Sequence, residues 1–193
     1  MIQSVKFDSS SMDIKKLSNS VITFVFNRLI EIIGIFVSFL GFLIFVALIS
    51  YSSSDPNFVF PENTEIKNLI GFQGSYASDL FFQSIGLISY LIPFTLIFTG
   101  LEIFKKKSFL IFFENTFYVV LYSSIGSLFF SHYYNSSFIL HINGNGGFVG
   151  NYLNQSIISN LIISYEKIFY ILFIILIFIL FLISINFNPK NFY

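Results

Sequence analysis

Four long apolar runs constrain this sequence more than any other feature. They are Ile32–Tyr51, Leu80–Leu101, Phe109–Phe130 and Ile168–Phe187, and each is uncharged except for Glu114 near the start of the third. About 20 apolar helical residues are needed to cross a hydrocarbon core of roughly 30 Å. A chain of 193 residues cannot bury four such helices on all sides, so lipid must surround them. Because the backbone must be satisfied internally in lipid, we predict an all-α membrane protein with four transmembrane helices.

Composition excludes several classes of protein. Hydrophobic residues make up 55% of the chain and charged residues 10%, whereas a soluble domain carries about 25% charged residues. This excludes a soluble enzyme and a disordered or nucleic-acid-coating protein, which need charge. Cysteine is absent and the two histidines, His132 and His141, cannot alone hold zinc. We therefore predict no catalytic, cofactor-binding or metal-binding residues and expect no cofactor.

The distribution of basic residues predicts the orientation. Only Lys67 and Lys167 fall on the side of the membrane expected outside. The other eight basic residues fall before the first run, between the second and third, or after the fourth: Lys6, Lys15, Lys16, Arg28, Lys105, Lys106, Lys107 and Lys190. Since basic loops stay inside, both termini should be cytoplasmic.

This orientation divides the chain into three parts. Residues 1–28 form a cytoplasmic N-terminal segment, 29–187 a four-helix transmembrane domain and 188–193 a cytoplasmic tail. The loops Ser52–Ser78 and Ser131–Glu166 face outward. The first apolar run is longer than the apolar part of a secretory signal, about 7–15 residues, so it reads as an uncleaved signal anchor.

Two flanking segments have the pattern of interfacial amphipathic helices. Before the first run, Leu17, Val21 and Phe24 follow a helical period that starts at Ile14. This predicts a helix lying on the inner face, although a first span that starts early and tilts fits equally well. In the second outer loop, apolar residues recur every four positions from residue 149 to 161 and predict one interfacial helix on the outer leaflet.

A glycine-rich stretch, Gly144–Gly150, precedes that second helix. It lacks the Gly-Lys-Ser/Thr of a phosphate loop, so we expect a turn that opens the helix.

A few polar and special residues fall near or within the spans. Glu114 is expected at the cytoplasmic interface or, with Asn115, in a polar contact between helices. Asp79 should suit the helix dipole at the outer start of the second span. Pro93 should kink that span and free a carbonyl near Ser89. A close-packing face on the first span is indicated by its small residues, Gly34, Ser38 and Gly41.

The first outer loop carries the most specific pattern. The chain reads S-Y-S-S-S-D-P at 50–56, N-L-I-G at 68–71, G-S-Y-A-S-D-L at 74–80 and I-G-L-I-S-Y-L-I-P at 85–93. This order resembles the N-terminal four-helix membrane region of the FtsK/SpoIIIE DNA translocases. The resemblance covers Leu29–Phe187, and departures include Ser75 and Ser89 where the family prefers alanine. It marks eight residues as structural or interaction positions: Tyr51, Asp55, Pro56, Gly71, Asp79, Gly86, Tyr90 and Pro93.

The resemblance implies a function as well as a fold. Full-length relatives combine this region with a cytoplasmic motor that acts in cell division and chromosome segregation. No G-x-x-x-x-G-K-[ST] motif occurs in this chain, so we predict no ATPase activity. We also expect no direct nucleic-acid binding, because the basic residues are spread over the N-terminal segment and a short cytoplasmic loop. A truncated gene, a split gene and a stand-alone anchor all fit the sequence.

The resemblance therefore predicts a membrane anchor and protein-interaction module in the bacterial inner membrane at the division septum. Its partners would be the lipid bilayer, further copies of the chain and septum proteins. The alternative is a small transporter or channel component, which would need polar groups at mid-membrane and broken helices in paired halves.

Overall fold

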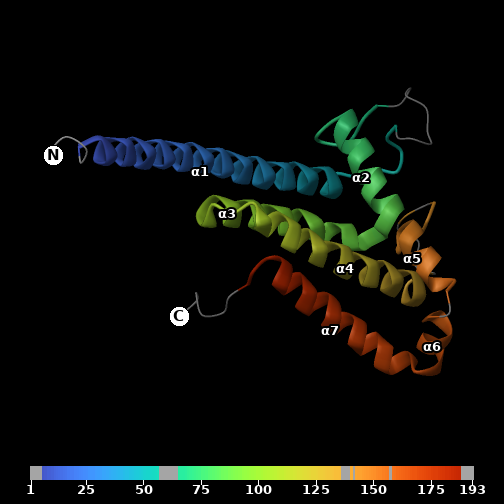
Figure 1. Ribbon diagram of the computed structural model, residues 1–193. Helices are drawn as coiled ribbons and strands as arrows, with labels where there is room; N and C mark the ends of the chain where they lie inside the picture. Colours follow the sequence, from blue (N-terminus) through green and yellow to red (C-terminus); the bar gives the residue numbers. More distant parts are fainter. Residues whose placement is uncertain (1–5, 57–64, 136–139, 141, 157, 188–193) are drawn as a thin grey trace, which may run out of the picture.

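The computed structural model describes residues 6–56, 65–135, 140, 142–156 and 158–187, with the side chains of the first helix described from Lys16 onward (Figure 1). All regular secondary structure in this part of the chain is helical. The elements are α1 (Lys6–Ile49), α2 (Phe72–Ile85), the 3-10 helix η1 (Gly86–Leu91), α3 (Ile92–Lys106), α4 (Leu110–Tyr133), α5 (Gly147–Asn154), α6 (Ile158–Ser164) and α7 (Glu166–Ser184).

Three described helical stretches are long and apolar enough to cross a membrane. They are Lys16–Ile49, the run Phe72–Lys106 through α2, η1 and α3, and Glu166–Ser184. The fourth expected span coincides with α4, whose 24 residues include Glu114, Asn115 and several serines and do not reach the same hydropathy. The all-helical class is confirmed, and a fourth span stays a prediction. The predicted tail, 188–193 with Lys190, lies outside the described residues.

Small residues bring α1 and α3 into close contact. A Cβ placed on Gly34 would lie 2.7 Å from the carbonyl oxygen of Gly100, and one on Gly41 would lie 3.0 Å from the carbonyl oxygen of Pro93. Between them, the Ser38 hydroxyl donates to the carbonyl of Ile97 at 2.8 Å. The close-packing face predicted on the first span is confirmed, and α3 is the helix that covers it.

The second predicted span is interrupted before its proline. α2 ends at Ile85, and a short 3-10 segment leads into α3, which has Pro93 in its first turn. A proline costs little in the first turn of a helix, because the backbone N–H that proline lacks would have no partner within the helix. The kink we assigned to Pro93 therefore begins earlier. We predicted a free carbonyl near Ser89, but the carbonyl of Ser89 itself accepts the N–H of Ile92.

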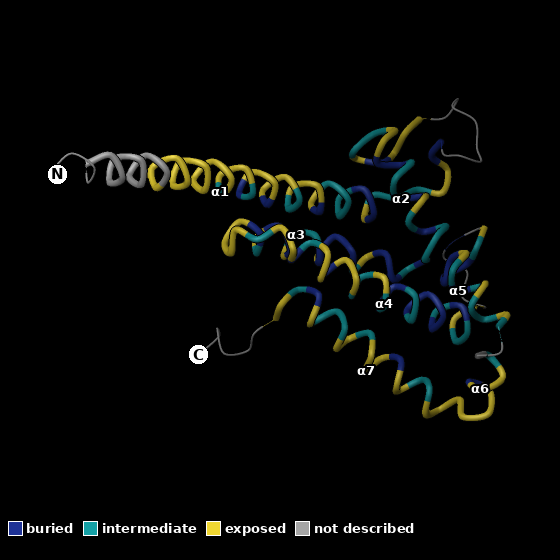
Figure 2. Tube along the Cα trace, viewed as in Figure 1, coloured by how far each residue is buried: buried dark blue, intermediate teal, exposed yellow. Residues whose placement is uncertain are grey.

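Polar side chains inside the bundle are hydrogen-bonded to one another. The Thr95 hydroxyl lies 3.1 Å from that of Tyr122 and 3.0 Å from that of Ser184, which joins α3, α4 and α7. Asn115 donates to the Thr99 hydroxyl at 2.8 Å, whereas its neighbour Glu114 is exposed. The inner faces of the helices are buried, as the dark blue parts of Figure 2 show, and the buried apolar residues include Ile88, Ile92, Ile103, Leu128, Phe129 and Phe173.

The second outer loop folds back onto the bundle. Its glycine-rich turn opens α5, as expected, and a Cβ on Gly146 would meet the carbonyl oxygen of Ser127 on α4 at 2.5 Å. The single interfacial helix that we predicted is two short helices, α5 and α6, and residue 157 between them lies outside the described residues. The His132 ring joins this region to α4 through a 2.8 Å contact between Nδ1 and the Asn154 side-chain oxygen.

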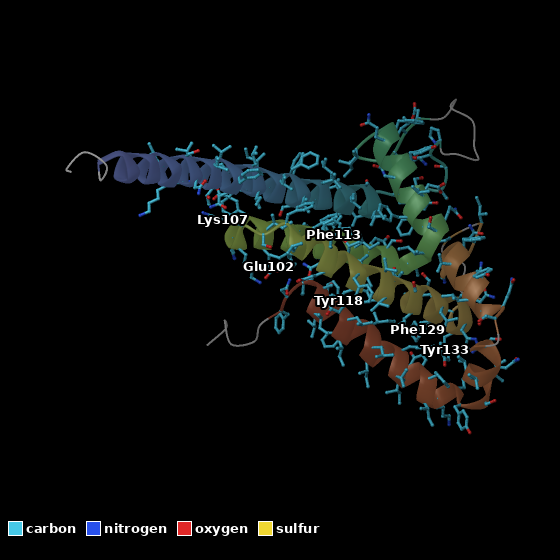
Figure 3. The ribbon with its side chains drawn as sticks, viewed as in Figure 1. Glu102, Lys107, Phe113, Tyr118, Phe129 and Tyr133 are labelled. Carbon is cyan, nitrogen blue, oxygen red and sulfur yellow. The ribbon has the colours of Figure 1, made fainter. Side chains whose placement is uncertain are left out.

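Charged residues gather where α3 ends. Glu31 of α1 pairs with Arg28 and, at 3.2 Å, with the ammonium of Lys107, while Lys106 pairs with Glu102 at 2.9 Å. Figure 3 labels Glu102 and Lys107 at this end of the bundle. α1 does not stop at this level but continues past it as a single helix.

Candidate interaction site at the outer ends of α1 and α2

The eight sequence-predicted residues fall into two groups. Tyr51, Asp55, Pro56, Gly71 and Asp79 lie together where the loop leaves α1 and enters α2. Farther along the chain, Gly86 and Tyr90 belong to η1 and Pro93 belongs to α3. Pro93 packs against Gly41 and takes no part in the loop.

A buried carboxylate organises the first loop. Asp55 has no exposed surface, and its two oxygens accept the backbone N–H groups of Lys67 at 3.0 Å and Asn68 at 2.8 Å. Hydrogen bonds to an ionised carboxylate are about twice as strong as neutral ones. Asp55 therefore ties the segment that leaves α1 to the segment that approaches α2.

Asn68 makes the second set of contacts and was not among the eight predicted residues. Its amide donates to the carbonyl of Ala47 in α1 at 2.8 Å, and its side-chain oxygen accepts the N–H of Ile70 at 3.1 Å. A Cβ on Gly74 would overlap that oxygen, so the first turn of α2 must stay small here. Asn two residues before a turn is a known local signal, but the partner in α1 could not be inferred from spacing.

Pro56 and Gly71 shape the two ends of this loop. The Pro56 carbonyl accepts the hydroxyl of Ser75 at 2.8 Å, which fixes the loop to α2. Gly71 has a φ of 75° at the N-cap of α2, a backbone conformation that residues with a Cβ rarely adopt, and its N–H donates to the carbonyl of Asn68 at 2.9 Å. Glycine is thus required at 71 by conformation.

Asp79 lies farther inside α2 than predicted. Because α2 begins at Phe72, Asp79 is about two turns from the helix start, and the dipole role we expected is wrong. Its carboxylate accepts the Tyr51 hydroxyl at 3.3 Å and the Gln83 amide at 3.4 Å. Burial and the adjacent Asp79 charge raise the pKa of Tyr51 to about 12.

Aromatic contacts extend this group to Tyr90. The Tyr51 ring lies edge-on to Phe82 with centroids 4.8 Å apart, and Phe82 lies edge-on to Tyr90 at 5.2 Å. Phe82 itself is buried between them. Edge-on ring contacts thus connect the end of α1, the last turn of α2 and η1.

Gly86 connects the two outer loops. Its φ is 72°, and an added Cβ would overlap the carbonyl of Asn145. That same carbonyl accepts the N–H of Leu87 at 2.9 Å, and the Asn143 amide donates to the carbonyl of Gln83 at 3.2 Å. The second loop is therefore seated on the break between α2 and η1.

The buried core of this site presents a small exposed rim. Ile66 is 42% exposed and Leu69 is 75% exposed, and Lys67 lies on the surface between them. We call Ile66, Lys67 and Leu69 the loop rim. Asp55 and Asn68 hold the backbone of the rim and are themselves inaccessible, whereas the rim side chains are exposed and open to contact with another molecule.

Among the described residues there is no group of three or more His, Asp or Glu side chains that could hold an ion. Asp55 and Asp79 both accept hydrogen bonds from protein donors. The arrangement is suited to presenting a shaped surface.

Comparison with known proteins agrees with this architecture. Residues 27–189 match the family model described as the 4TM region of DNA translocase FtsK/SpoIIIE. The DNA translocase FtsK of Rickettsia typhi is 41% identical over 54 residues, and that of Pseudomonas putida is 32% identical over 65 residues. These stretches cover 28% and 33% of this chain and 7% and 8% of the two relatives.

The family match covers the membrane region and not the motor. No solved structure matches the chain. Together with three helices apolar enough to span a bilayer, the match identifies a multi-pass protein of the bacterial inner membrane. Since the matched residues make up most of the sequence, the chain belongs to the family of the 4TM region of DNA translocase FtsK/SpoIIIE.

Proposed function

We propose that this chain is the membrane anchor and protein-interaction module of an FtsK-type DNA translocase. In this role it contributes to cell division and chromosome segregation. The family match over 27–189 carries the proposal, because the relatives it shares this region with are DNA translocases. We propose four spans with both termini cytoplasmic, so that the loop rim faces outward.

The interior of the bundle supports an anchor over a transporter. Within the described residues, no buried side-chain nitrogen or oxygen lacks a hydrogen-bond partner. Thr95, Tyr122 and Ser184 satisfy one another between helices. A transport path needs polar groups at mid-membrane that are free to bind a substrate. Polar side chains that hydrogen-bond to one another between helices contribute to helix packing instead.

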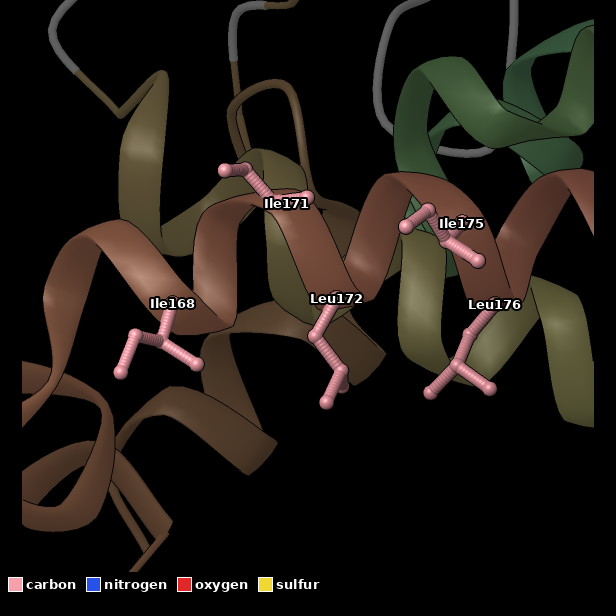
Figure 4. Close-up of a pocket in the computed structure, with 5 residues that line it drawn as sticks. All are labelled: Ile168, Ile171, Leu172, Ile175 and Leu176. Atoms are coloured by element: carbon pink, nitrogen blue, oxygen red, sulfur yellow. The ribbon is translucent and has the colours of Figure 1, made fainter.

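The proposal also assigns partners to two surfaces. Division-septum proteins would dock on the loop rim, which is held rigid from beneath by Asp55. Further copies of the chain would pack on the apolar side of α7, which carries an open pocket of about 450 Å³; Figure 4 labels the residues that line it. Its lining is wholly aliphatic: Ile168, Ile171, Leu172, Ile175 and Leu176.

A localisation experiment tests this function. A fluorescent fusion of the chain should concentrate at midcell during constriction, and Leu69→Ser should lower midcell enrichment without lowering the amount inserted in the membrane. Phe148→Ser is the matched control, because Phe148 is an exposed apolar residue of α5 with similar exposure, 62%. Uniform distribution of the unmutated fusion around the envelope would contradict the anchor role, and equal loss with both variants would contradict docking on the rim.

A further inference from the structure

The part of α1 that extends beyond α3 has two different sides. Residues 16–27 form about 18 Å of helix on the far side of the Glu31–Lys107 ion pair, where α3 has ended (Figure 1). In Figure 2 this stretch is coloured as exposed along most of its length. Leu17 is 70% exposed and Phe24 is 59% exposed. Apolar side chains at this density need a covering other than water.

The helical repeat relates each side of this segment to a side of the span. Residues about 18 positions apart lie on the same side of an α-helix, because 3.6 residues make one turn. The exposed apolar residues of the segment align with residues of the span that face away from the bundle. The pairs are Leu17 with Ile35, Val21 with Phe39, and Phe24 with Phe42, and all six side chains are more than half exposed.

The polar residues align with the opposite side. Those of the segment repeat the positions by which the span packs against α3. The pairs are Lys16 with Gly34, Ser20 with Ser38, and Thr23 with Gly41. The side that α3 covers in the span is therefore polar where α3 no longer covers it. The side that meets lipid stays apolar except at Ser18, which aligns with Phe36.

From this alignment we infer that residues 16–27 are a membrane-surface element whose apolar side is in the lipid of the cytoplasmic leaflet. The lipid-facing side of the span continues into this segment without a change of register. If the segment leans outward from the bundle, its apolar side turns toward the acyl chains and its polar side toward the cytoplasm. Lys16 then lies at the headgroups, where a basic side chain is attracted to anionic lipid.

The occupant of this surface is lipid and not a second copy of the chain. A helix–helix seam would use a narrow stripe, as the small-residue face of α1 does toward α3. Here Ile22, Val25 and Phe26 widen the exposed apolar side well beyond a stripe. A wide apolar side opposite a polar one is the pattern of a helix at the surface of a bilayer. The choice of leaflet rests on the proposed topology.

Site-directed spin labelling of the full chain tests the inference. The sequence has no cysteine, so single Cys residues can be labelled without background. In phosphatidylethanolamine/phosphatidylglycerol vesicles, labels at Leu17, Val21 and Phe24 should collide mainly with oxygen, which partitions into lipid. Labels at Ser20 and Thr23 should collide mainly with a water-soluble nickel chelate. The ratio of the two collision rates should differ by about tenfold between the sets, with a label at Phe39 as the lipid-facing reference.

Three results would overturn it. High nickel access at both sets would show that the segment projects into water. Low access to both reagents at 17, 21 and 24 would show that protein covers them, as in a dimer of copies. High oxygen access at both sets would show that lipid surrounds the helix. Failure of the midcell experiment would leave this measurement unaffected, so the two proposals are tested separately.

Discussion

Replacing Asp55 by Asn tests how the buried carboxylate holds the loop rim. Asp55 accepts two backbone N–H groups and is fully buried. The amide keeps one acceptor oxygen, presents an NH₂ to the other N–H, and removes the charge from both bonds. Hydrogen bonds to charged groups contribute about 1.5–3 kcal/mol, and an unsatisfied buried N–H costs about 1–3 kcal/mol. We expect local opening of the loop to become about 2–3 kcal/mol easier.

Amide hydrogen exchange measures the free energy of this local opening directly. Protection of the Lys67 and Asn68 amides should fall about 30- to 150-fold in Asp55→Asn, since every 1.4 kcal/mol is a factor of ten. Asp79→Asn is the matched control, because the Asp79 bonds are long, 3.3 and 3.4 Å, and do not involve these amides. Protection within about threefold of the unmutated chain would refute the assignment of Asp55 as the organiser of the loop.

Three further predictions concern topology, glycine and the buried phenol. A Cys at Lys106 should be shielded from an impermeant thiol reagent in intact cells, whereas one at Asn143 should react; the opposite pattern would reverse the orientation. Gly86→Ala should lower the free energy of unfolding by about 3 kcal/mol, because the added Cβ would overlap the carbonyl of Asn145. Gly71→Ala should lower it by about 1–2 kcal/mol, because only the positive φ is unfavourable there. Both effects are measured as the loss of monodisperse protein in detergent on heating. The difference between ultraviolet titrations of the unmutated chain and Tyr51→Phe should show a phenol with a pKa of about 12. The neutral phenol should stabilise the fold fully below about pH 10, and this stabilisation should be lost as the pH rises through the folded-state pKa of about 12.

Apolar length located the helices well, and the orientation of their faces was harder to infer. The close face of α1 followed from small residues at helical spacing, and the structure confirmed it at Gly34 and Ser38. For Glu114 two roles remained open in the sequence, a carboxylate at the interface or a polar contact between helices together with Asn115. Adjacent residues point about 100° apart, and the structure leaves Glu114 exposed and buries Asn115. Packing against α3 and α7 turns Asn115 inward.

The outer loops show why the site was only partly predictable. Asp55 and Gly71 were found from a motif, but the role of Asn68 depends on a carbonyl of α1 that is 21 positions earlier in the chain. The second loop depends likewise on Gly86, which accepts a close approach from residue 145. Contacts of this range are set by how loops close over the bundle, and no local period in the sequence encodes them.

The contacts of Asn186 determine how a pull on the chain after α7 would reach the bundle. Asn186 has a φ of 50°, and its amide donates to the Glu102 carboxylate of α3 and, at 3.2 Å, to Asn115 of α4. A load applied beyond Phe187 therefore meets these cross-links before it can unwind the last turn of α7. We therefore expect α3 and α4 to share such a load with α7, since both are hydrogen-bonded to Asn186.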